Sequence, residues 1–402
     1  MDLTASELRK GATAPSWIRK VLSWGGGSDG RVLLVLLLAI YFGAVGYWAP
    51  TQGWEQAWRH VRVPSMPADF ADTRGILSSY DRFRGGAPMD QVQLAPLNRA
   101  HTYSMTYPRT WLAFAYLGLG ESATYPVALT LIVACFGLSL WYLGRLTWGQ
   151  AAVFAPLWIA PSLMLGVERG NADLLMYLMV LIACCLFSRR AILGACVVLL
   201  GAGMLKLYPV AAMVPALRHR RGLAIVSGCA VLFLLFCFID RHDLAWVNHY
   251  TPREAGISFG ALVISAKWHV SQTIGLGLAA VCALVAVVSA RRSPVWSVSH
   301  DMQGSGFLAG CSILTLCFVI GNNYMYRWWF GLLLLPQLVR WIMAEGPEAR
   351  WAGWLLTALI MTTWAISESR LWLIGMVLNW LIFGGLLYGL ASVMLPVAWR
   401  RQ

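Results

Sequence analysis

Uninterrupted apolar runs of about 20 residues recur along most of this chain, and no other feature of the sequence limits its fold as strongly. Such a run is long enough to cross a bilayer as a helix, and a helix satisfies its own backbone hydrogen bonds in lipid. The composition agrees, since 58% of the 402 residues are hydrophobic and only 12% are charged, whereas soluble proteins carry about 25% charged residues. We therefore expect an all-α polytopic membrane protein.

Lysine and arginine residues flank the apolar runs and predict their orientation, because cytoplasmic loops carry an excess of both. Segment 1–31 holds five of them and precedes the first run, at 32–48. A cleaved signal peptide would have a shorter apolar core and a small-residue cleavage site. We expect an uncleaved first helix, with 1–31 as a cytoplasmic N-terminal segment.

Segment 191–217 decides the topology of the rest of the chain. If it crossed the membrane, the basic cluster at 218–221 would lie outside, against the positive-inside tendency. Its middle carries Lys206 and Pro209, a charge beside a helix breaker. We expect two half-helices in a re-entrant hairpin, which is tolerated only where protein or a watery cavity surrounds it. A topology with an odd number of spans ranks second.

This topology places ten spanning helices in a transmembrane domain at 32–395, followed by a cytoplasmic tail at 396–402. Both termini are then cytoplasmic. The spans after the first are expected at about 124–144, 149–167, 171–187, 222–239, 272–290, 304–320, 328–343, 351–366 and 371–395.

The first outer loop, 50–120, is the longest and contains a polar stretch at 66–88. It ends at 107–120 in an aromatic segment that is too short to span, and we expect a short helix at the membrane interface there. A carboxylate-bearing loop on a membrane scaffold indicates the working part of a membrane enzyme. The polar stretch carries Asp69, Asp72, Asp81, Arg74, Arg82 and Arg84.

The outer side of this topology collects most of the acidic residues, twelve of the 18 in the chain. It also collects arginines at helix ends, although short periplasmic loops normally avoid them. The guanidinium fork suits phosphate, so we expect an anionic ligand on this side. Pairing with the nearby acids is the alternative, and it holds for some of the arginines. The acids are Glu55, Asp69, Asp72, Asp81, Asp90, Glu121, Glu168, Asp173, Asp240, Asp243, Glu254 and Glu368.

Four later clusters fall on the same side. The run 168–173, Glu-Arg-Gly-Asn-Ala-Asp, forms a tight break between spans, which a capped turn with an ion pair would also explain. Lys206 lies mid-segment, where a lysine is costly and becomes a functional candidate unless it reaches the interface. Arg253 is either a second phosphate contact or part of a surface pair. Interface aromatic belts explain the tryptophans after 322–327, but not Arg327.

Motifs for nucleotides, metals and nucleophilic catalysis are missing from the sequence. It contains no Gly-rich phosphate loop, no dinucleotide fingerprint and no Ser/His/Asp arrangement. All nine cysteines lie inside apolar runs without metal-ligand spacing. We expect no metal, no cofactor and no nucleic-acid partner, and the energy for a transfer reaction would lie in a lipid-linked substrate.

The motifs occur in a recognisable order: an outer-loop Asp with Gly-Gly downstream, Tyr-Pro-Arg-x-Trp from Tyr107, Glu-Arg-Gly-Asn-x-Asp from Glu168, Lys-x-Tyr-Pro from Lys206, and Asn-Tyr-x-Tyr-Arg from Asn323. This order resembles the polyprenol-phosphate-mannose-dependent mannosyltransferase family and its uncharacterised bacterial relatives, which are GT-C membrane glycosyltransferases. The likeness covers about 32–345. It implies a GT-C-like helical bundle whose first outer loop carries the catalytic aspartate.

The resemblance also implies a site. In that family the aspartate is followed four residues on by an apolar or aromatic residue and nine further on by glycine, as Asp72 is by Ile76 and Gly85. Ile76 stands where relatives often have tyrosine. Asp72 is the expected general base and Asp69 the second candidate. The residues expected to bind substrate are Arg74, Tyr107, Arg109, Glu168, Arg169, Asn171, Lys206, Tyr208, Arg253, Asn323, Tyr326 and Arg327.

The implied reaction moves a sugar, with inversion, from a polyprenyl-phosphate donor to a glycan or glycolipid acceptor. It would take place on the periplasmic face of a bacterial inner membrane. A transporter or flippase of lipid-linked sugars is the competing class, since it would also gather charge in membrane cavities. An O-antigen polymerase or ligase is the third, but such enzymes usually have a large late periplasmic loop.

Overall fold

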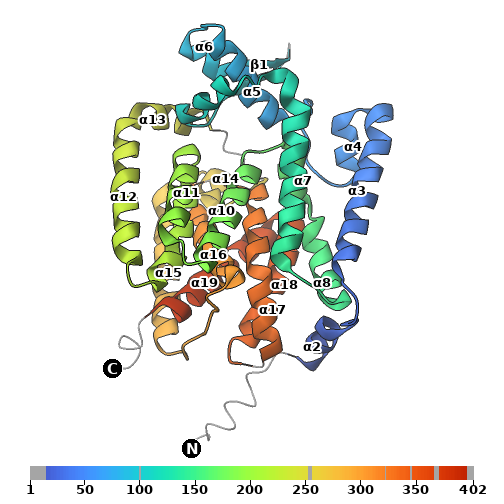
Figure 1. The fold of residues 1–402 in the computed structure, drawn as a ribbon, viewed down its shortest axis with the longest axis vertical. Coiled ribbons are helices and arrows are strands. Elements are labelled where there is room, and N and C mark those ends of the chain that lie inside the picture. Colours follow the sequence, from blue (N-terminus) through green and yellow to red (C-terminus); the bar gives the residue numbers. More distant parts are fainter. Residues whose placement is uncertain are drawn as a thin grey trace, which may run out of the picture. The chain divides into compact units, whose positions relative to one another are not determined.

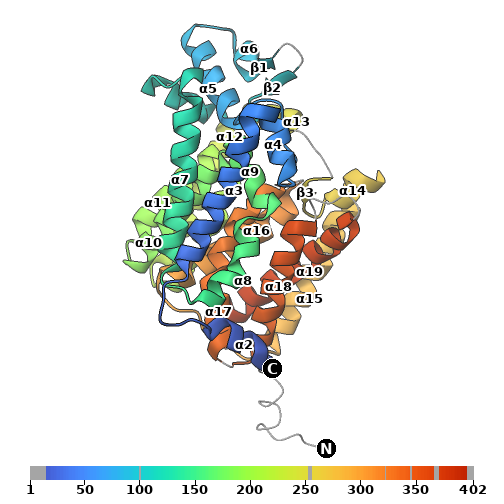
Figure 2. The same cartoon turned by 90° about the vertical axis from the view of Figure 1, so that its right-hand side faces the viewer.

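The computed structural model describes residues 15–98, 101–251, 256–321, 323–344, 346–365 and 371–395. Helices dominate these ranges, and the strands are short (Figures 1 and 2). The chain divides into two compact units. Unit 1 comprises 1–43, 140–163 and 254–402, and unit 2 comprises 44–139 and 164–253.

Six helical segments in the described residues are long and apolar enough to cross a membrane. A seventh arises if α8 (Trp148–Trp158) and α9 (Pro161–Arg169), bent by 60° at their junction, count as one. Pro161 opens α9, which explains the break, because proline lacks the N–H that would continue α8. The protein is therefore a helical, multi-pass membrane protein. The six are α3 (Arg31–Gln52), Glu121–Leu143, which contains α7 (Thr124–Leu143), α12 (Gly222–Ile239), α15 (Gln272–Arg291), α16 (Met302–Ile320) and α19 (Trp372–Met394).

Three of the ten predicted spans coincide with helices that are too short to belong to these six. Segment 171–187 corresponds to α10 (Asp173–Ser188) and 351–366 to α18 (Ala349–Ala365). Segment 328–343 is divided between the 3₁₀ helix η4 (Met325–Leu334) and α17 (Leu335–Ala344). The count of ten spans stays a prediction.

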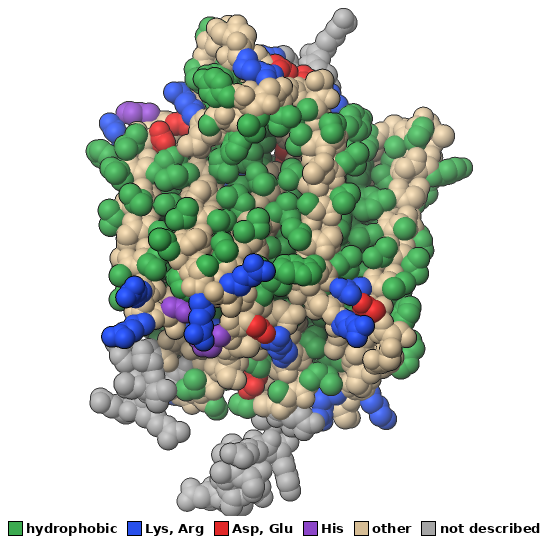
Figure 3. Space-filling model, viewed as in Figure 1, with side chains coloured by type: hydrophobic (Ala, Val, Ile, Leu, Met, Phe, Trp, Pro, Cys, Tyr) green, Lys and Arg blue, Asp and Glu red, His purple; other side chains and the backbone are tan. Residues whose placement is uncertain are grey.

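In unit 2, α10 packs against α11 (Ile192–Leu205), and α11 packs against α12. The helix α12 buries one narrow stripe, Gly222, Cys229 and Phe236, at intervals of seven residues. Its other faces expose large apolar side chains such as Val231 and Leu234, at 65% and 66%. Figure 3 shows this hydrophobic surface along α12, with charged side chains gathered beyond its ends. Such a surface suits lipid contact.

Segment 191–217 is broken at the predicted place. The helix α11 ends at Leu205, Lys206 has extended backbone, and the 3₁₀ helix η3 (Tyr208–Arg218) follows. The fourteen residues of α11 rise about 21 Å and the eleven residues of η3 about 22 Å, so the two helices match in length. The helices α11 and η3 pack against each other. Burial together with the charges of Arg218 and Arg190 lowers the pKa of His219, so Arg190 lies near the far end of the segment.

The first outer loop folds into short elements at one end of unit 2 (Figure 2). It contains an antiparallel strand pair that the sequence did not predict, β1 with β2. The aromatic segment forms the 3₁₀ helix η1, which buries Trp111 and exposes Tyr116 and Leu117, as a segment at a membrane interface would. The elements are α4 (Trp54–His60), α5 (Ala71–Arg84), α6 (Met89–Gln93), β1 (Leu94–Asn98), β2 (His101–Ser104), η1 (Arg109–Leu117) and η2 (Glu121–Ala123). At the far end of α12, α13 (Arg241–Tyr250) reaches this loop, because Asp243 accepts from the backbone N–H of Arg109 at 2.7 Å.

Unit 1 packs α15 and α18 against α19, and η4 against α16. Its aromatic core joins Trp296, Phe307, Trp341 and Trp351, with ring centroids 4.8–6.4 Å apart. The remaining elements are α2 (Ser16–Ser23), α14 (Val263–Trp268), β3 (Ser258–Phe259) and β4 (Asn323–Tyr324), the two strands being paired antiparallel.

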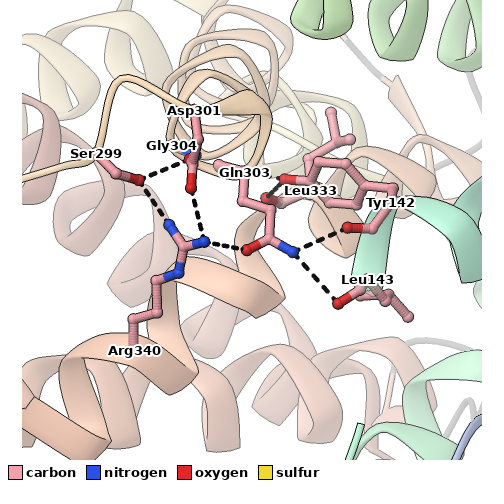
Figure 4. Close-up of polar contacts among 8 residues, drawn as sticks. All are labelled: Tyr142, Leu143, Ser299, Asp301, Gln303, Gly304, Leu333 and Arg340. Atoms are coloured by element: carbon pink, nitrogen blue, oxygen red, sulfur yellow. Dashed lines mark hydrogen bonds and ion pairs between the residues drawn. The ribbon is translucent and has the colours of Figure 1, made fainter. Parts of the chain in front are cut away.

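A polar clamp fastens the start of α16 to α17 (Figure 4). Asp301 caps α16 by accepting the N–H of Gly304 at 2.8 Å, and Arg340 of α17 pairs with that carboxylate at 2.7 Å. Gln303 accepts from Arg340 and donates to the carbonyl oxygen of Tyr142 at 3.0 Å. Burial alone would raise the pKa of Asp301, but the hydrogen bonds from Arg340, a serine hydroxyl and the cap lower it to about 2.

Candidate functional site

The predicted base lies at the start of a buried helix. Asp72 occupies the first turn of α5, whose preceding residue Phe70 has a left-handed backbone (φ 47°). Ile76 and Gly85, at the spacing noted in the sequence, belong to the same helix. Ile76 is buried one turn after Asp72, and Gly85 is the C-cap. The Asp72 side chain is only 8% exposed.

Asp72 sits in a charged environment contributed by the later helices of unit 2. Its carboxylate accepts a hydrogen bond from the side-chain amide of Asn171. Burial raises the pKa of Asp72, against the opposing effects of Arg169, the Asn171 hydrogen bond and Lys206. A carboxylate with a raised pKa is a better proton acceptor, as a general base requires.

The turn 168–171 holds the loop that carries Asp72 at three points. Glu168, fully buried, accepts at a single oxygen from the hydroxyl of Ser65 (2.7 Å), the N–H of Met66 (3.1 Å) and the indole of Trp54 (3.3 Å). The carbonyl oxygen of Gly170 accepts from the hydroxyl of Thr73. Asn171 supplies the third attachment, to Asp72.

Gly170 is required at this turn. Its φ of +56° is left-handed, and an added Cβ would meet the side chains of Thr73, Ala128 and Phe70. Glycine alone adopts this backbone without strain and leaves room for α5 to approach.

Lys206 lies at the break between α11 and η3, and its charge is already paired. Its ammonium forms an ion pair with Asp173, which is 1% exposed, and donates to the Asn171 side-chain oxygen at 3.3 Å. Tyr208 donates to the same aspartate at 2.7 Å. The ammonium also lies over the ring of Tyr107, 5.0 Å from its centroid. Lys206 therefore organises the cluster through Asp173 and Asn171.

The described residues of the cluster hold three carboxylates, on Asp72, Glu168 and Asp173, and two cations, on Arg169 and Lys206. With every group ionised the cluster carries one excess negative charge. One bound proton would balance it, and burial raises the pKa of Glu168, to about 7, as well as the pKa of Asp72.

Seven of the fourteen predicted site residues thus come together: Asp72, Tyr107, Glu168, Arg169, Asn171, Lys206 and Tyr208. Three others in unit 2 have other partners. Asp69 accepts from Tyr125, Arg74 pairs with Glu121 at 3.2 Å, and Arg109 pairs with Asp243 at 3.1 Å.

Four predicted site residues remain. Arg253 is outside the described residues. Asn323, Tyr326 and Arg327 belong to unit 1. The Asn323 amide donates to the carbonyl oxygens of Cys317, in the last turn of α16, and of Gly321, the latter at 2.8 Å. Tyr326 stacks on Tyr324 with ring centroids 5.5 Å apart.

Asp173 is the main residue that sequence reasoning left out of the site, because the start of a helix explains an aspartate there without a partner. The signal that could have found it is a lysine inside an apolar stretch, since a buried ammonium needs a carboxylate. Thr73 and Ser65, which attach to the turn, are ordinary loop residues by sequence and carry no such signal.

Comparisons of this chain with protein-family models, with curated proteins and with solved structures gave no significant match.

Proposed function

We propose that this protein is a membrane glycosyltransferase that transfers a sugar from a polyprenyl-phosphate donor to a glycan or glycolipid acceptor, with inversion. One observation carries the proposal: a buried carboxylate, Asp72, is oriented by an amide and flanked by two cations. This is the combination that glycosyl transfer from a lipid phosphate needs, a base beside positive charge. The motif order that resembles the polyprenol-phosphate-mannose-dependent mannosyltransferases supports the same reading.

In the proposed step the acceptor hydroxyl attacks the anomeric carbon from the face opposite the phosphate. Asp72 takes the hydroxyl proton, the new carbon–oxygen bond forms, and the bond to the phosphate oxygen breaks with its electron pair. A positioned base contributes about 10²–10⁴-fold to such a rate. Cations near the leaving phosphate stabilise the charge that develops on it.

Arg169 is the proposed phosphate contact within unit 2. Its side chain is 12% exposed, its Nε lies 3.9 Å from a carboxylate oxygen of Glu168, and its positive charge opposes the rise in the pKa of Asp72. Lys206 already neutralises Asp173, so its proposed contribution is to hold Asn171, and through it Asp72. Arg327, with Asn323 and Tyr326, stays a proposed donor contact on the ground of the resemblance alone.

We place the site on the periplasmic face of a bacterial inner membrane, with both termini cytoplasmic and ten spans. The segment 191–217 would be re-entrant, because its ends carry basic residues that the positive-inside tendency keeps in the cytoplasm. Lys206, at the turn of the hairpin, then points to the outer side, where the first outer loop lies.

Two aspartates of the same loop provide a matched test. The full-length protein in nanodiscs is given undecaprenyl-phosphate mannose, glucose or arabinose, and the release of undecaprenyl phosphate in the presence of a membrane glycolipid extract is measured. Asp72→Asn should lower the rate by about 10²–10⁴-fold. Asp69→Asn should change it less than threefold, because Asp69 is bonded to Tyr125. If the wild type turns over none of the three donors, the proposal is contradicted. If Asp72→Asn turns over a donor at a near-normal rate, the choice of base is contradicted.

A further inference from the structure

Unit 2 brings two arginine-rich loops to the same end of its helices. One joins α10 to α11 and carries Arg189 and Arg190, and the other joins η3 to α12 and carries Arg220 and Arg221. All four side chains are exposed. The matched arms of the α11–η3 hairpin explain why the loops meet although about 30 positions separate them.

Acidic partners for this cluster are distant within unit 2. The sequence contains no Asp or Glu from 174 to 239. Asp173 begins the sixteen-residue helix that ends at the first loop, and Asp240 follows the eighteen-residue helix that starts at the second. These helices place the two acids about 24 and 27 Å from the arginines. That is beyond the Debye length of about 8 Å at physiological ionic strength, so neither acid neutralises the cluster.

Apolar side chains adjoin the arginines directly. Leu193 and Val197 on α11 are 62% and 55% exposed, and Leu223, two residues after Arg221, is 70% exposed. The surface therefore offers positive charge at its end and an apolar wall immediately beside it. A ligand that fits both parts carries a phosphate and hydrocarbon chains, whereas a free phosphate would use the charge alone.

We propose that these two loops form a binding site for the headgroup of an anionic phospholipid, with its acyl chains along α11 and α12. The phosphate is held by guanidinium groups from both loops, which present several donors to it. The site is at the opposite end of α10 from Asp173 and the cluster around Asp72, so it is separate from the proposed catalytic site.

The test compares three arginine pairs, each neutralised in the full-length protein. Arg189→Gln/Arg190→Gln and Arg220→Gln/Arg221→Gln each remove two charges from the site. Arg291→Gln/Arg292→Gln removes two charges from the end of α15 in unit 1 and is the matched control. Retention of phosphatidylglycerol against phosphatidylcholine is measured by native mass spectrometry from mixed micelles, with inorganic phosphate as competitor.

The two site pairs should each weaken phosphatidylglycerol retention by about 10- to 30-fold, which is the effect expected for two arginines at a lipid headgroup. The control pair should change it less than threefold. An equal loss in all three pairs would show general attraction to anionic lipid and overturn the site. Equal retention of the two lipids by the wild type, or full displacement by millimolar inorganic phosphate, would overturn the choice of ligand.

Discussion

The ion pair between Lys206 and Asp173 allows the sharpest test of how the cluster is held together. Lys206→Met keeps most of the side-chain stem and removes the ammonium, so Asp173, which is 1% exposed, loses its cation. Removing one partner of a buried pair costs about 3–5 kcal/mol of unfolding free energy. Because the hydroxyl of Tyr208 still donates to Asp173 at 2.7 Å, we expect the lower end, about 3 kcal/mol.

The double variant Lys206→Met/Asp173→Asn separates the buried charge from lost packing. It removes the uncompensated carboxylate and keeps an acceptor for Tyr208, so it should recover about 2 of those 3 kcal/mol. The assay is unfolding in mixed micelles by titration with dodecyl sulfate, followed by circular dichroism. A cost below about 1 kcal/mol for Lys206→Met, or a double variant no more stable than the single one, would refute the reasoning.

Four further predictions concern single positions. Burial raises the pKa of Asp72 above its ordinary value of 3.8, so the stabilising effect of this group is complete below pH 3.8 and is lost as the pH rises through the pKa of the folded state. In denaturation at pH 8, Asp72→Asn should therefore be at least as stable as the wild type. A less stable variant would contradict this. Glu168→Ala leaves three partly buried donors without their acceptor and should cost about 2–4 kcal/mol, whereas Glu168→Gln keeps an acceptor and should restore more than half of that in the same measurement. The pKa of Asp301 is lowered to about 2, so its stabilising effect is present above 3.8 and is lost as pH falls towards 2. Because this pair is about 40% exposed, the effect should be at most about 1 kcal/mol and should vanish in Arg340→Met, as unfolding midpoints at pH 2–5 would reveal. Gly170→Ala forces a left-handed alanine and should cost about 1–2 kcal/mol, with a matching loss of transferase rate if the turn positions α5; unchanged stability would contradict the strain.

Much of the fold could be predicted because lipid imposes strict rules on a chain. The candidate spans in the structure coincide with apolar runs in the sequence, since hydrophobic thickness sets their length. The break at Lys206 could be predicted from a charge followed by proline. The paired strands β1 and β2 could not, because their pairing depends on the surrounding loop rather than on a strong local pattern.

For the candidate site, Asp72, Asn171 and Lys206 could be selected as candidates from the sequence. Lys206 stands out because an ammonium inside an apolar stretch is costly. Asp72 lies in a polar stretch and was selected by the spacing to Ile76 and Gly85 that the resemblance implies. Which of these side chains pair with one another followed from the tertiary fold. Lys206 is paired with Asp173, and Glu168 binds a loop more than 100 residues earlier in the chain. Such pairings depend on how distant segments pack and which way their side chains point, and no local pattern encodes either.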